Sequence, residues 1–403
     1  MDFNDSPQEA AFRAEVRAWM AKNAAEYASP PATPWSEAQI VALGRKWLKR
    51  KADAGYATIT WPKAVGGRGG TAMEEVIFRQ EERKYVLPDG PFLSIGVNMA
   101  CPAIRRHGSP EQYQRFAPLT LSGDIVWCQL FSEPAAGSDL GGVRTRAVRE
   151  GDNWIVNGQK VWNSWAHHAD WAILLARTDP GAPKHKGLTF FVLDMRTPGV
   201  EARPIRQITG RTDFNETFLS DVVIPDSCRI GEVGEGWAVA MTVLMNERAG
   251  PRDKDGLVLR LIERARSAER PGGTALDSAQ VRTTLARLYA EEQGVKYFGY
   301  RLLTSLSKGE PPSPAVAMIK LTQTHYAQLA NAYAMDLDDF AGLFETPERP
   351  HQDQIFFEYL YQQGLRIAGG ADEVLRNQIA ERVLGMPQEM RADKDVPFDQ
   401  IPR

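Results

Sequence analysis

The feature that most constrains the fold is a change in hydrophobic period along the chain. Between about residues 126 and 230 the sequence forms short runs rich in branched and aromatic residues, such as DWAILLART and GLTFFVLDM, separated by loops. Such runs are typical of β-strands, whereas apolar residues on both sides recur at helical spacing. Because 403 residues exceed one ordinary core, the pattern predicts three domains: helical over 1–125, β over 126–232 and helical over 233–403.

The first helical region opens with a helix-start signal. In SPQE, Ser6 is placed to be the N-cap, Pro7 the first helical residue and Glu9 the partner that completes a capping box. Further helical patterns cover 74–85 and 110–122, and the glycine-rich WPKAVGGRGG before them is predicted to be a loop. One apolar face is expected to contain Phe12, Val16, Trp19 and Met20.

The clearest local signal in the β region is WIVNGQKVWN, residues 154–163. Strand-forming residues flank Asn157-Gly158, a pair that suits a type I′ turn, so a hairpin is predicted here. With the other short runs it predicts a compact antiparallel β domain.

The last region returns to the helical period. A broad apolar stripe ends at Gly309, Ser313 is placed to cap the following helix, and Ala368-Gly369-Gly370 separates the last two helical segments. Long helices with short links predict an antiparallel four-helix bundle, so the fold class is α+β. The stripe consists of Val281, Leu285, Leu288, Tyr289 and Val295.

Composition excludes several classes of protein. The 48 basic and 51 acidic residues leave a net charge of −3, so no basic surface for nucleic acid is expected. No apolar run is long enough for a membrane span, and the acidic amphipathic start is unlike a secretory signal. Three scattered cysteines make neither a disulfide framework nor a CxxC site. These features predict a cytoplasmic protein outside the membrane.

The common catalytic motifs are missing as well. The sequence contains no G-x-G-x-x-G after a strand, no Walker A, no HExxH and no GxSxG. His167-His168 has no carboxylate or thiol at metal-ligand spacing nearby, so we predict a solvated or structural pair and no metal site.

CQLFSEPAAGSDLGGVRTRA, residues 128–147, turns from a buried strand into a loop of small residues. Ser132 and Ser138 offer hydroxyls, and Ala135, Ala136 and Gly137 leave the backbone open to a ligand. From spacing alone, a β-turn whose serines cap their own backbone is the favoured interpretation, and a ligand-binding loop is the alternative.

This stretch resembles the signature of the acyl-CoA dehydrogenase family. Six other segments resemble the same family in the same order and together cover nearly the whole chain. They are WPKAVGGRGG, NWIVNGQKVWNSWAHHADWAILLARTD, KHKGLTFFVLDM, NETFLSDVVIP, GEGWAVAMTVLMNER and GGADEVLRNQIAERVLG. The family fold is an N-terminal helical domain, a central β domain and a C-terminal four-helix bundle.

The resemblance implies FAD as cofactor and assigns contacts to it. Backbone groups of Leu130 and Phe131 and the hydroxyl of Ser132 would bond the N1/O2 side of the flavin. There they would stabilise the negative charge that develops on reduction. Trp162 would pack beside the ring, with plain strand core as the alternative, and Ser164 would bond near O4/N5. The resemblance places Ser138 at the pantetheine arm of an acyl-CoA.

Contacts to the rest of FAD rest on fewer residues. The resemblance implies a basic residue at the diphosphate, for which Arg270 is our candidate, Arg266 the close second and a surface salt bridge the alternative. Gly369-Gly370 could offer free N–H groups to the adenosine or diphosphate. The Gln-x-x-Gly-Gly segment of better-known members has no counterpart here, so part of the usual cofactor cradle is missing or rebuilt.

The resemblance also requires a carboxylate base over the α carbon. Many members place it where this chain has Gly369, which has no side chain, and nearby Asp372 and Glu373 look like first-turn helix residues. Branched- and long-chain members instead have a Glu-Arg pair that matches Glu247-Arg248. Glu247 is therefore the predicted base, Arg248 is assigned near the substrate or to structure, and Pro251 should make the helix irregular. The alternative is an exposed Glu at a helix break.

The resemblance therefore implies FAD-dependent oxidation of an acyl-CoA to the trans-2-enoyl-CoA, with a bulky, branched or alicyclic acyl chain. It implies an electron-transferring flavoprotein as electron acceptor and a homotetramer or a heterotetramer with a homologous subunit. A non-catalytic partner subunit and an oxygen-using flavin oxidase or monooxygenase are the alternatives.

Overall fold

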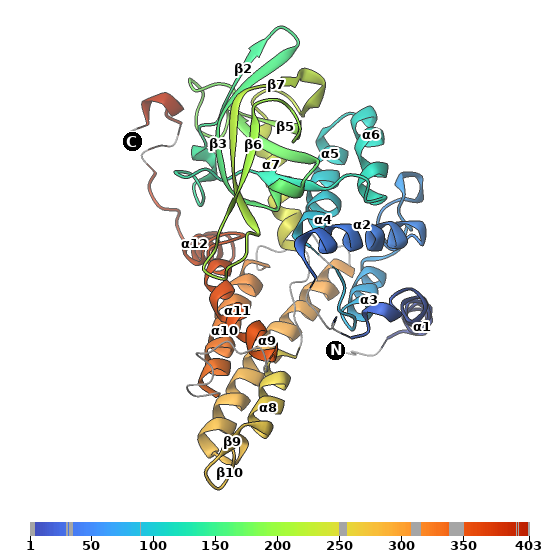
Figure 1. The fold of residues 1–403 in the computed structure, drawn as a ribbon. Helices are drawn as coiled ribbons and strands as arrows, with labels where there is room; N and C mark the ends of the chain where they lie inside the picture. The colour runs from blue at the N-terminus through green and yellow to red at the C-terminus, as the bar shows by residue number, and fades with distance from the viewer. Residues whose placement is uncertain are drawn as a thin grey trace. The chain divides into compact units, whose positions relative to one another are not determined.

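The chain divides into two compact units, which we describe separately. Unit 1 comprises Met1–Gln207, Thr212–Glu247 and Arg391–Arg403, and unit 2 comprises Ile208–Arg211 and Arg248–Met390. A computed structural model describes residues 5–29, 31, 35–88, 90–249, 256–307, 316–337, 350–391, 393 and 395–401 (Figure 1).

Short helices form the N-terminal part of unit 1. The capping box predicted at Ser6 is present: its hydroxyl accepts from Glu9 N, and the Glu9 carboxylate accepts from Ser6 N at 2.7 Å. Phe12, Val16 and Met20 are buried as predicted, and Trp19 packs against the same core. The helices are α1 Pro7–Asn23, α2 Glu37–Asp53, α3 Ala72–Glu82, α4 Pro91–Ile95, α5 Cys101–His107 and α6 Pro110–Leu121.

The central part of unit 1 is one sheet with strand order β6-β7-β3-β2-β4-β5-β8, with β1 paired to β4. Most pairs are antiparallel as predicted, but β1 runs parallel to β4 and β2 meets β4 in parallel. Strand direction depends on the connection, here the chain through β2 and β3, and composition does not reveal it. The strands are β1 Trp127–Leu130, β2 Arg146–Glu150, β3 Asn153–Ser164, β4 Trp171–Arg177, β5 Leu188–Asp194, β6 Val200–Ile205, β7 Phe214–Pro225 and β8 Arg229–Ile230.

The predicted hairpin at Asn157-Gly158 is wrong. Residues Asn153–Ser164 form a single strand, and the tight turn lies before it, where Glu150 pairs with Asn153. Asn157 occupies a bulge, and its side-chain amide exchanges hydrogen bonds of 3.0 and 2.9 Å with Asp221. A Cβ on Gly158 would lie 2.4 Å from Thr145 Oγ1. The Asn-Gly pair therefore serves a bulge and a close strand approach instead of a turn.

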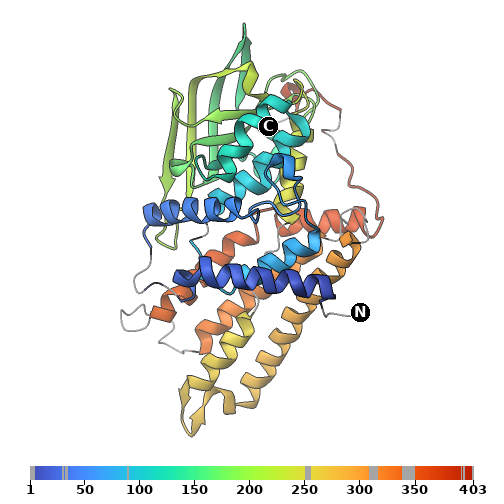
Figure 2. The same cartoon turned by 90° about the vertical axis from the view of Figure 1, so that its right-hand side faces the viewer.

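The core of unit 1 joins the sheet to flanking helices. Strand β4 is buried along its whole length and β5 along nearly all of it. Residues of α5, α6 and α7 (Gly236–Ala249) belong to the same buried cluster. The ribbon shows these helices beside the sheet (Figures 1 and 2). The helix α7 begins closely packed on β5, because a Cβ on Gly236 would lie 2.6 Å from the backbone of Thr189.

Unit 2 is helical and contains a two-stranded hairpin, β9 Glu269–Arg270 with β10 Gly273–Thr274. The helix α10 packs against α8, α9, α11 and α12 (Figure 1). Of the predicted stripe, Leu285, Leu288 and Val295 are buried, whereas Tyr289 is 42% exposed. Gly309 and Ser313 lie outside the described residues. The helices are α8 Leu257–Ser267, α9 Ala279–Ser307, α10 Val316–Leu337, α11 Pro350–Leu365 and α12 Asp372–Arg382.

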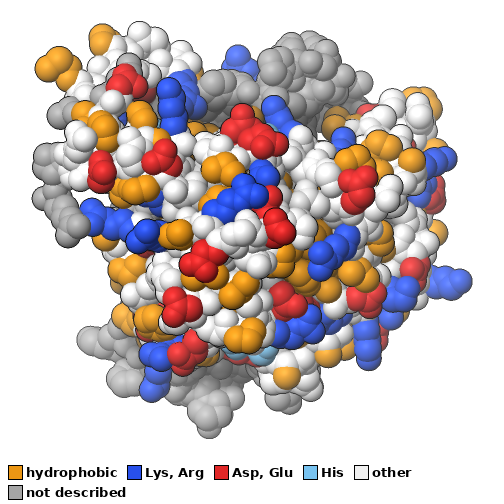
Figure 3. All heavy atoms as spheres, turned by 90° about the horizontal axis from the view of Figure 1, so that it is seen from above, with side chains coloured by type: hydrophobic (Ala, Val, Ile, Leu, Met, Phe, Trp, Pro, Cys, Tyr) orange, Lys and Arg blue, Asp and Glu red, His pale blue; other side chains and the backbone are white. Residues whose placement is uncertain are grey.

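The predicted order of helical, β and helical parts is confirmed. Among the described residues, no helix is both long and apolar enough to cross a membrane. On the face drawn in Figure 3, basic and acidic side chains are interspersed over the described surface, in line with the near balance of charges in the sequence.

Candidate active site

The loop that follows β1 is fixed by a buried carboxylate. Glu133 accepts hydrogen bonds from the backbone N–H groups of Arg144 at 2.6 Å and Thr145 at 2.8 Å. Its own N–H and C=O pair with Ala136 at 3.0 Å in both directions. These bonds close the loop on itself, so the segment that carries Ser132 has one defined path.

Lys160 of β3 holds the same loop through hydrogen bonds to Phe131 and Glu133. It is fully buried, and its ammonium donates to Glu133 Oε1 at 2.8 Å, Phe131 O at 3.0 Å and Leu175 O at 2.7 Å. Burial lowers the pKa of Lys160 to about 8, against the opposing effect of Glu133. Burial would by itself raise the pKa of Glu133, but Lys160 and the loop amides lower it. Both groups are therefore predominantly charged at pH 7.

Arg177 of β4 fixes the far end of the loop. Its guanidinium donates to Val143 O at 3.0 Å and to Gly141 O at 2.6 Å. The ring of Phe398, from the C-terminal segment, lies 3.5 Å from the guanidinium carbon. The loop from 131 to 145 is thus held by two buried cations, Lys160 on β3 and Arg177 on β4.

Two segments that the sequence analysis assigned to the flavin lie side by side. Val161 N donates to Ser132 O at 2.9 Å, and Asn163 Nδ2 donates to Gln129 O at 2.9 Å. The segment Leu130, Phe131 and Ser132 therefore adjoins the segment Trp162 to Ser164. The side chains of Leu130 and Phe131 are buried, which leaves their backbone groups as the atoms that could contact a ligand.

Trp162 has an unusual backbone and an exposed side chain. Its φ is +61°, at an irregularity in the β3–β7 pairing between Val161 and Asn163. The indole is 60% exposed and contacts Phe214 edge-on, with ring centroids 6.3 Å apart. The alternative of a strand-core tryptophan is therefore wrong. A left-handed backbone at a bulky residue is costly, and such outliers gather at ligand sites.

Polar groups around Trp162 are available to a ligand. Within the described part of the chain, the hydroxyls of Ser132, Ser138 and Ser164 form no hydrogen bond with another residue, and the buried Oδ1 of Asn163 has no partner either. The exposed indole, with the hydroxyls of Ser132 and Ser164 on the two joined segments, fits the edge of a planar, polar ring system such as a flavin.

Glu247 lies one turn after the buried part of α7. Val239 and Val243 are fully buried on the core face, and Glu247 follows Val243 by four residues, which places it on the same face. It is half-buried and belongs to unit 1, together with Ser132 and Trp162. The side chain of Arg248 and the whole of Pro251 lie outside the described residues, so the predicted irregularity after Glu247 does too.

The helix α7 is tied to the N-terminal helices by a side-chain contact. His107 Nε2 lies 2.8 Å from Thr242 Oγ1, and Asn246 Nδ2 donates to Thr242 O at 2.8 Å. The His107 contact therefore ties the turn that precedes Glu247 to α5, and the Asn246 bond lies within α7 itself, as suits a positioned acid–base group.

The remaining candidates lie in unit 2. Arg270 donates to Leu337 O, the last residue of α10, at 2.6 Å, so it caps the end of that helix. Arg266 forms an exposed salt bridge with Glu263 at 2.7 Å. The alternative of a surface salt bridge therefore describes Arg266 and not Arg270.

Gly369 and Gly370 form the turn before α12, with φ angles of +66° and +105° that side chains rarely adopt. Lys320 donates to Gly370 O at 2.7 Å. Asp372 opens α12, as predicted for a first-turn acid, but it is buried and ion-paired with Arg366. A paired carboxylate of this kind stabilises the turn.

Sequence reasoning missed the residues that position the site. Glu133 and Lys160 lie inside the quoted segments, but nothing in their spacing shows that they meet in the core. Asn163, between Trp162 and Ser164, also belongs to this group, because its side chain joins β3 to β1. The polar residues of β3 give no local signal that singles out Lys160.

Comparisons with known proteins match nearly the whole chain to one family. Family models described as the N-terminal, middle and C-terminal domains of acyl-CoA dehydrogenase match residues 6–124, 128–222 and 234–384. The chain is 42% identical to acyl-CoA dehydrogenase FadE34 of Mycobacterium tuberculosis over 84% of its length, but spans only 45% of that protein. It is 35% identical to acyl-CoA dehydrogenase IpdE1 of the same organism, covering 94% of this chain and 98% of that one.

Two solved structures extend the comparison to the fold. The ChsE4–ChsE5 complex from Mycobacterium tuberculosis matches with a TM-score of 0.82 at 30% identity, covering 96% of this chain and 100% of that one. A protein described as the Tcur3481–Tcur3483 steroid ACAD matches with a TM-score of 0.79 at 29% identity, with the same coverage.

Proposed function

The chain belongs to the acyl-CoA dehydrogenase family, and we propose that it oxidises an acyl-CoA thioester to the trans-2-enoyl-CoA with FAD as cofactor. Enzymes of this family are oxidoreductases that in general use FAD. The observation that carries the proposal is the exposed Trp162 on a left-handed backbone, next to the hydroxyls of Ser132 and Ser164, which bond to no other residue that the structure describes.

In this reaction the chain supplies the proton acceptor and the cofactor contacts. Glu247, half-buried on the core face of α7, takes the proton from the carbon α to the thioester. When bound, FAD supplies the acceptor for the hydride that leaves the β carbon. Ser132 and Ser164 hydrogen-bond the ring edge, Trp162 packs beside it, and Ser138 contacts the pantetheine arm. The loop held by Glu133 and Lys160 keeps these donors in place.

Cofactor contacts from unit 2 complete the proposal. Arg270 is our candidate for the FAD diphosphate, and the free N–H groups of the Gly369-Gly370 turn are candidates for its adenosine side. Arg248, which follows the base, is assigned near the substrate or to structure.

For the substrate, we propose a bulky, branched or alicyclic acyl chain. The base position used by many members is Gly369 here, and one of the similar solved structures is described as a steroid ACAD. A small residue at that position leaves more room than the carboxylate it replaces. The ring systems of steroids are the bulkiest chemistry that this comparison suggests.

For the assembly, we propose a homotetramer or a heterotetramer with a homologous subunit, reoxidised by an electron-transferring flavoprotein. The structural relative ChsE4–ChsE5 is a complex of two named chains, which favours the heteromeric form. The cytoplasmic location stays a prediction.

Anaerobic flavin bleaching tests the proposal. The chain is expressed alone and with a candidate sister subunit, and each preparation is mixed with straight, branched and ring-bearing acyl-CoAs. We expect yellow protein whose flavin bleaches fastest with the ring-bearing or branched substrates. A chain that is colourless alone and gives yellow protein only with the sister subunit would support the non-catalytic partner subunit, and protein that is colourless in both cases would contradict the proposal. Peroxide formation in air without dye reduction would support an oxidase or monooxygenase.

A further inference from the structure

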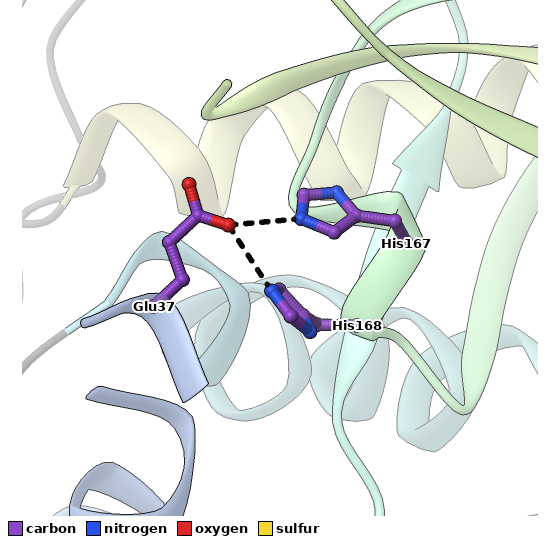
Figure 4. Close-up of side chains that lie close together, drawn as sticks. All are labelled: Glu37, His167 and His168. Atoms are coloured by element: carbon purple, nitrogen blue, oxygen red, sulfur yellow. Dashed lines mark hydrogen bonds and ion pairs between the residues drawn. The ribbon is translucent and has the colours of Figure 1, made fainter. Parts of the chain in front are cut away.

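The histidine pair after β3 meets a carboxylate from a distant part of unit 1. His167 and His168 end the short turn Ala166–His168, and Glu37 is the first residue of α2 (Figure 4). Glu37 Oε2 lies 3.2 Å from His167 Nε2 and 3.4 Å from His168 Nε2. Sequence spacing did not reveal this partner, because 130 residues separate Glu37 from His167.

The hydrogen bonds around His167 fix which ring nitrogen faces the carboxylate as an acceptor. Asn215 Nδ2 donates to Asn163 O at 3.0 Å, so the amide oxygen of Asn215 must face His167 Nδ1, at 2.8 Å. That oxygen only accepts, so Nδ1 carries the proton. In the neutral imidazole, Nε2 then presents its lone pair to Glu37 Oε2 at 3.2 Å, and either a second proton on His167 or a metal ion between the two atoms satisfies this contact.

The groups that hydrogen-bond to His167 and Glu37 are of the kind that surround metal ligands in proteins. Metal-binding histidines usually donate their other ring N–H to a carbonyl or carboxylate, as His167 does to Asn215. The other carboxylate oxygen of Glu37, Oε1, accepts a hydrogen bond from Thr212 Oγ1 at 2.8 Å, and this bond orients the carboxylate.

The distances suit a small divalent ion. The three ligand atoms lie within 4.8 Å of one another. Corners of a tetrahedron with bonds of about 2.0–2.1 Å are roughly 3.3–3.4 Å apart, close to the separations of Glu37 Oε2 from the two imidazoles. Two imidazoles and one carboxylate match the ligands of Zn²⁺, and all three side chains are only half-buried, so an ion and a water molecule can reach them.

We propose that Glu37, His167 and His168 bind one Zn²⁺ ion or a similar divalent transition metal, which joins the start of α2 to the segment after β3. This departs from the expectation of a solvated or structural pair without metal. It does not depend on the proposed dehydrogenase activity, because none of the three residues is assigned to flavin or substrate.

Metal titration of the holoenzyme tests the site. Purified protein is treated with a chelator, exchanged into metal-free buffer at slightly alkaline pH, and titrated with Zn²⁺ by calorimetry and with Co²⁺ by visible absorption. We expect one saturable site per chain, a Co²⁺ spectrum of a tetrahedral or five-coordinate site, and release of the ion as the pH falls below the ordinary histidine pKa of about 6.5.

Variants identify the ligands. His168→Gln and Glu37→Gln keep the size of each side chain and should each weaken Zn²⁺ binding at least about tenfold. His325→Gln is the matched control, because His325 is exposed on α10 in unit 2, and it should bind like the parent protein. FAD content and circular dichroism establish that each variant is folded. The proposal is overturned if the parent protein shows no saturable Zn²⁺ binding, or if folded His168→Gln and Glu37→Gln both bind Zn²⁺ as tightly as the parent.

Discussion

At the scale of single residues, Glu247 carries the proposed chemistry. A Glu247→Gln variant keeps the size of the side chain but cannot accept the proton. Because one general base contributes about 10²–10⁴-fold, we expect turnover to fall by roughly three orders of magnitude while FAD stays bound. Stopped-flow measurement of flavin reduction by a good acyl-CoA gives the rate. Glu373→Gln, at an exposed carboxylate near Gly369, is the control and should reduce flavin at the parent rate; near-normal turnover in Glu247→Gln would remove Glu247 from the mechanism.

The exposed indole of Trp162 contributes little to the packing of the chain itself. Trp162→Ala should leave the thermal stability nearly unchanged, since the indole is 60% exposed. It should weaken FAD binding by about 0.5–1.5 kcal/mol, the size of a typical aromatic contact. Flavin retained after dialysis against a range of FAD concentrations measures the change. Val223→Ala, at another exposed apolar residue of the same sheet, should have no effect. Unchanged FAD affinity in Trp162→Ala would contradict the proposed flavin contact.

At the scale of elements, the position of α7 depends on its first residue. Gly236 packs against the backbone of Thr189, which cannot move aside as a flexible side chain could. A Gly236→Ala change should therefore displace α7 from β5 and cost about 1–3 kcal/mol of stability, as overpacking usually does. Glu247 would shift with the helix, so turnover should fall as well. Thermal unfolding and steady-state rates measure the two effects.

Gly294 provides the matched substitution. It lies in α9 with open space around the position of a Cβ, so Gly294→Ala should leave stability unchanged or raise it by up to about 1 kcal/mol through helix propensity. Equal stability for Gly236→Ala and Gly294→Ala would show that α7 is not fixed by this contact.

At the scale of the whole molecule, half-buried histidines predict the response to acid. Burial lowers the pKa of His107, His168 and His185 below the ordinary value. The unfolded chain therefore takes up more protons than the native one once the pH falls below about 6.5. The stability that these neutral histidines contribute is fully present above that pH and is lost as the pH falls through their native pKa values.

Urea unfolding in the presence of a chelator, between about pH 7.5 and about pH 5.5, measures this response. We expect the unfolding midpoint to decrease with pH, and less steeply in His185→Gln, whose ring lies 4.4 Å from that of Trp237. The exposed His325 again provides the control substitution. A midpoint that is constant or rises over this range contradicts the prediction.

Much of the architecture follows from local sequence. The capping box at Ser6 and the buried positions Phe12, Val16 and Met20 depend on residues within one or two helical turns of one another. The alternation of helical and strand periods is likewise local. For this reason the order of helical, β and helical parts could be predicted without any knowledge of packing.

The features that the sequence left open depend on contacts between distant residues. Asn157-Gly158 has the composition of a turn, but a close approach to Thr145 makes it part of a strand. Lys160 looks like an ordinary polar strand residue, until burial against Glu133 and two carbonyl groups gives it a structural role. The sequence also identified the segments that now meet at Ser132 and Trp162, but only through their resemblance to a family.

By itself, then, the sequence determined which segments are helix and strand and which family they resemble, because those properties are written in neighbouring residues. Only the tertiary structure decided that Trp162 is exposed on a left-handed backbone and that Glu37 faces His167 and His168. The physical reason is that the exposure of a side chain and its contacts depend on how segments distant in the sequence pack together. Glu37 and His167, for example, are 130 residues apart, and a local sequence pattern carries no information about such a contact.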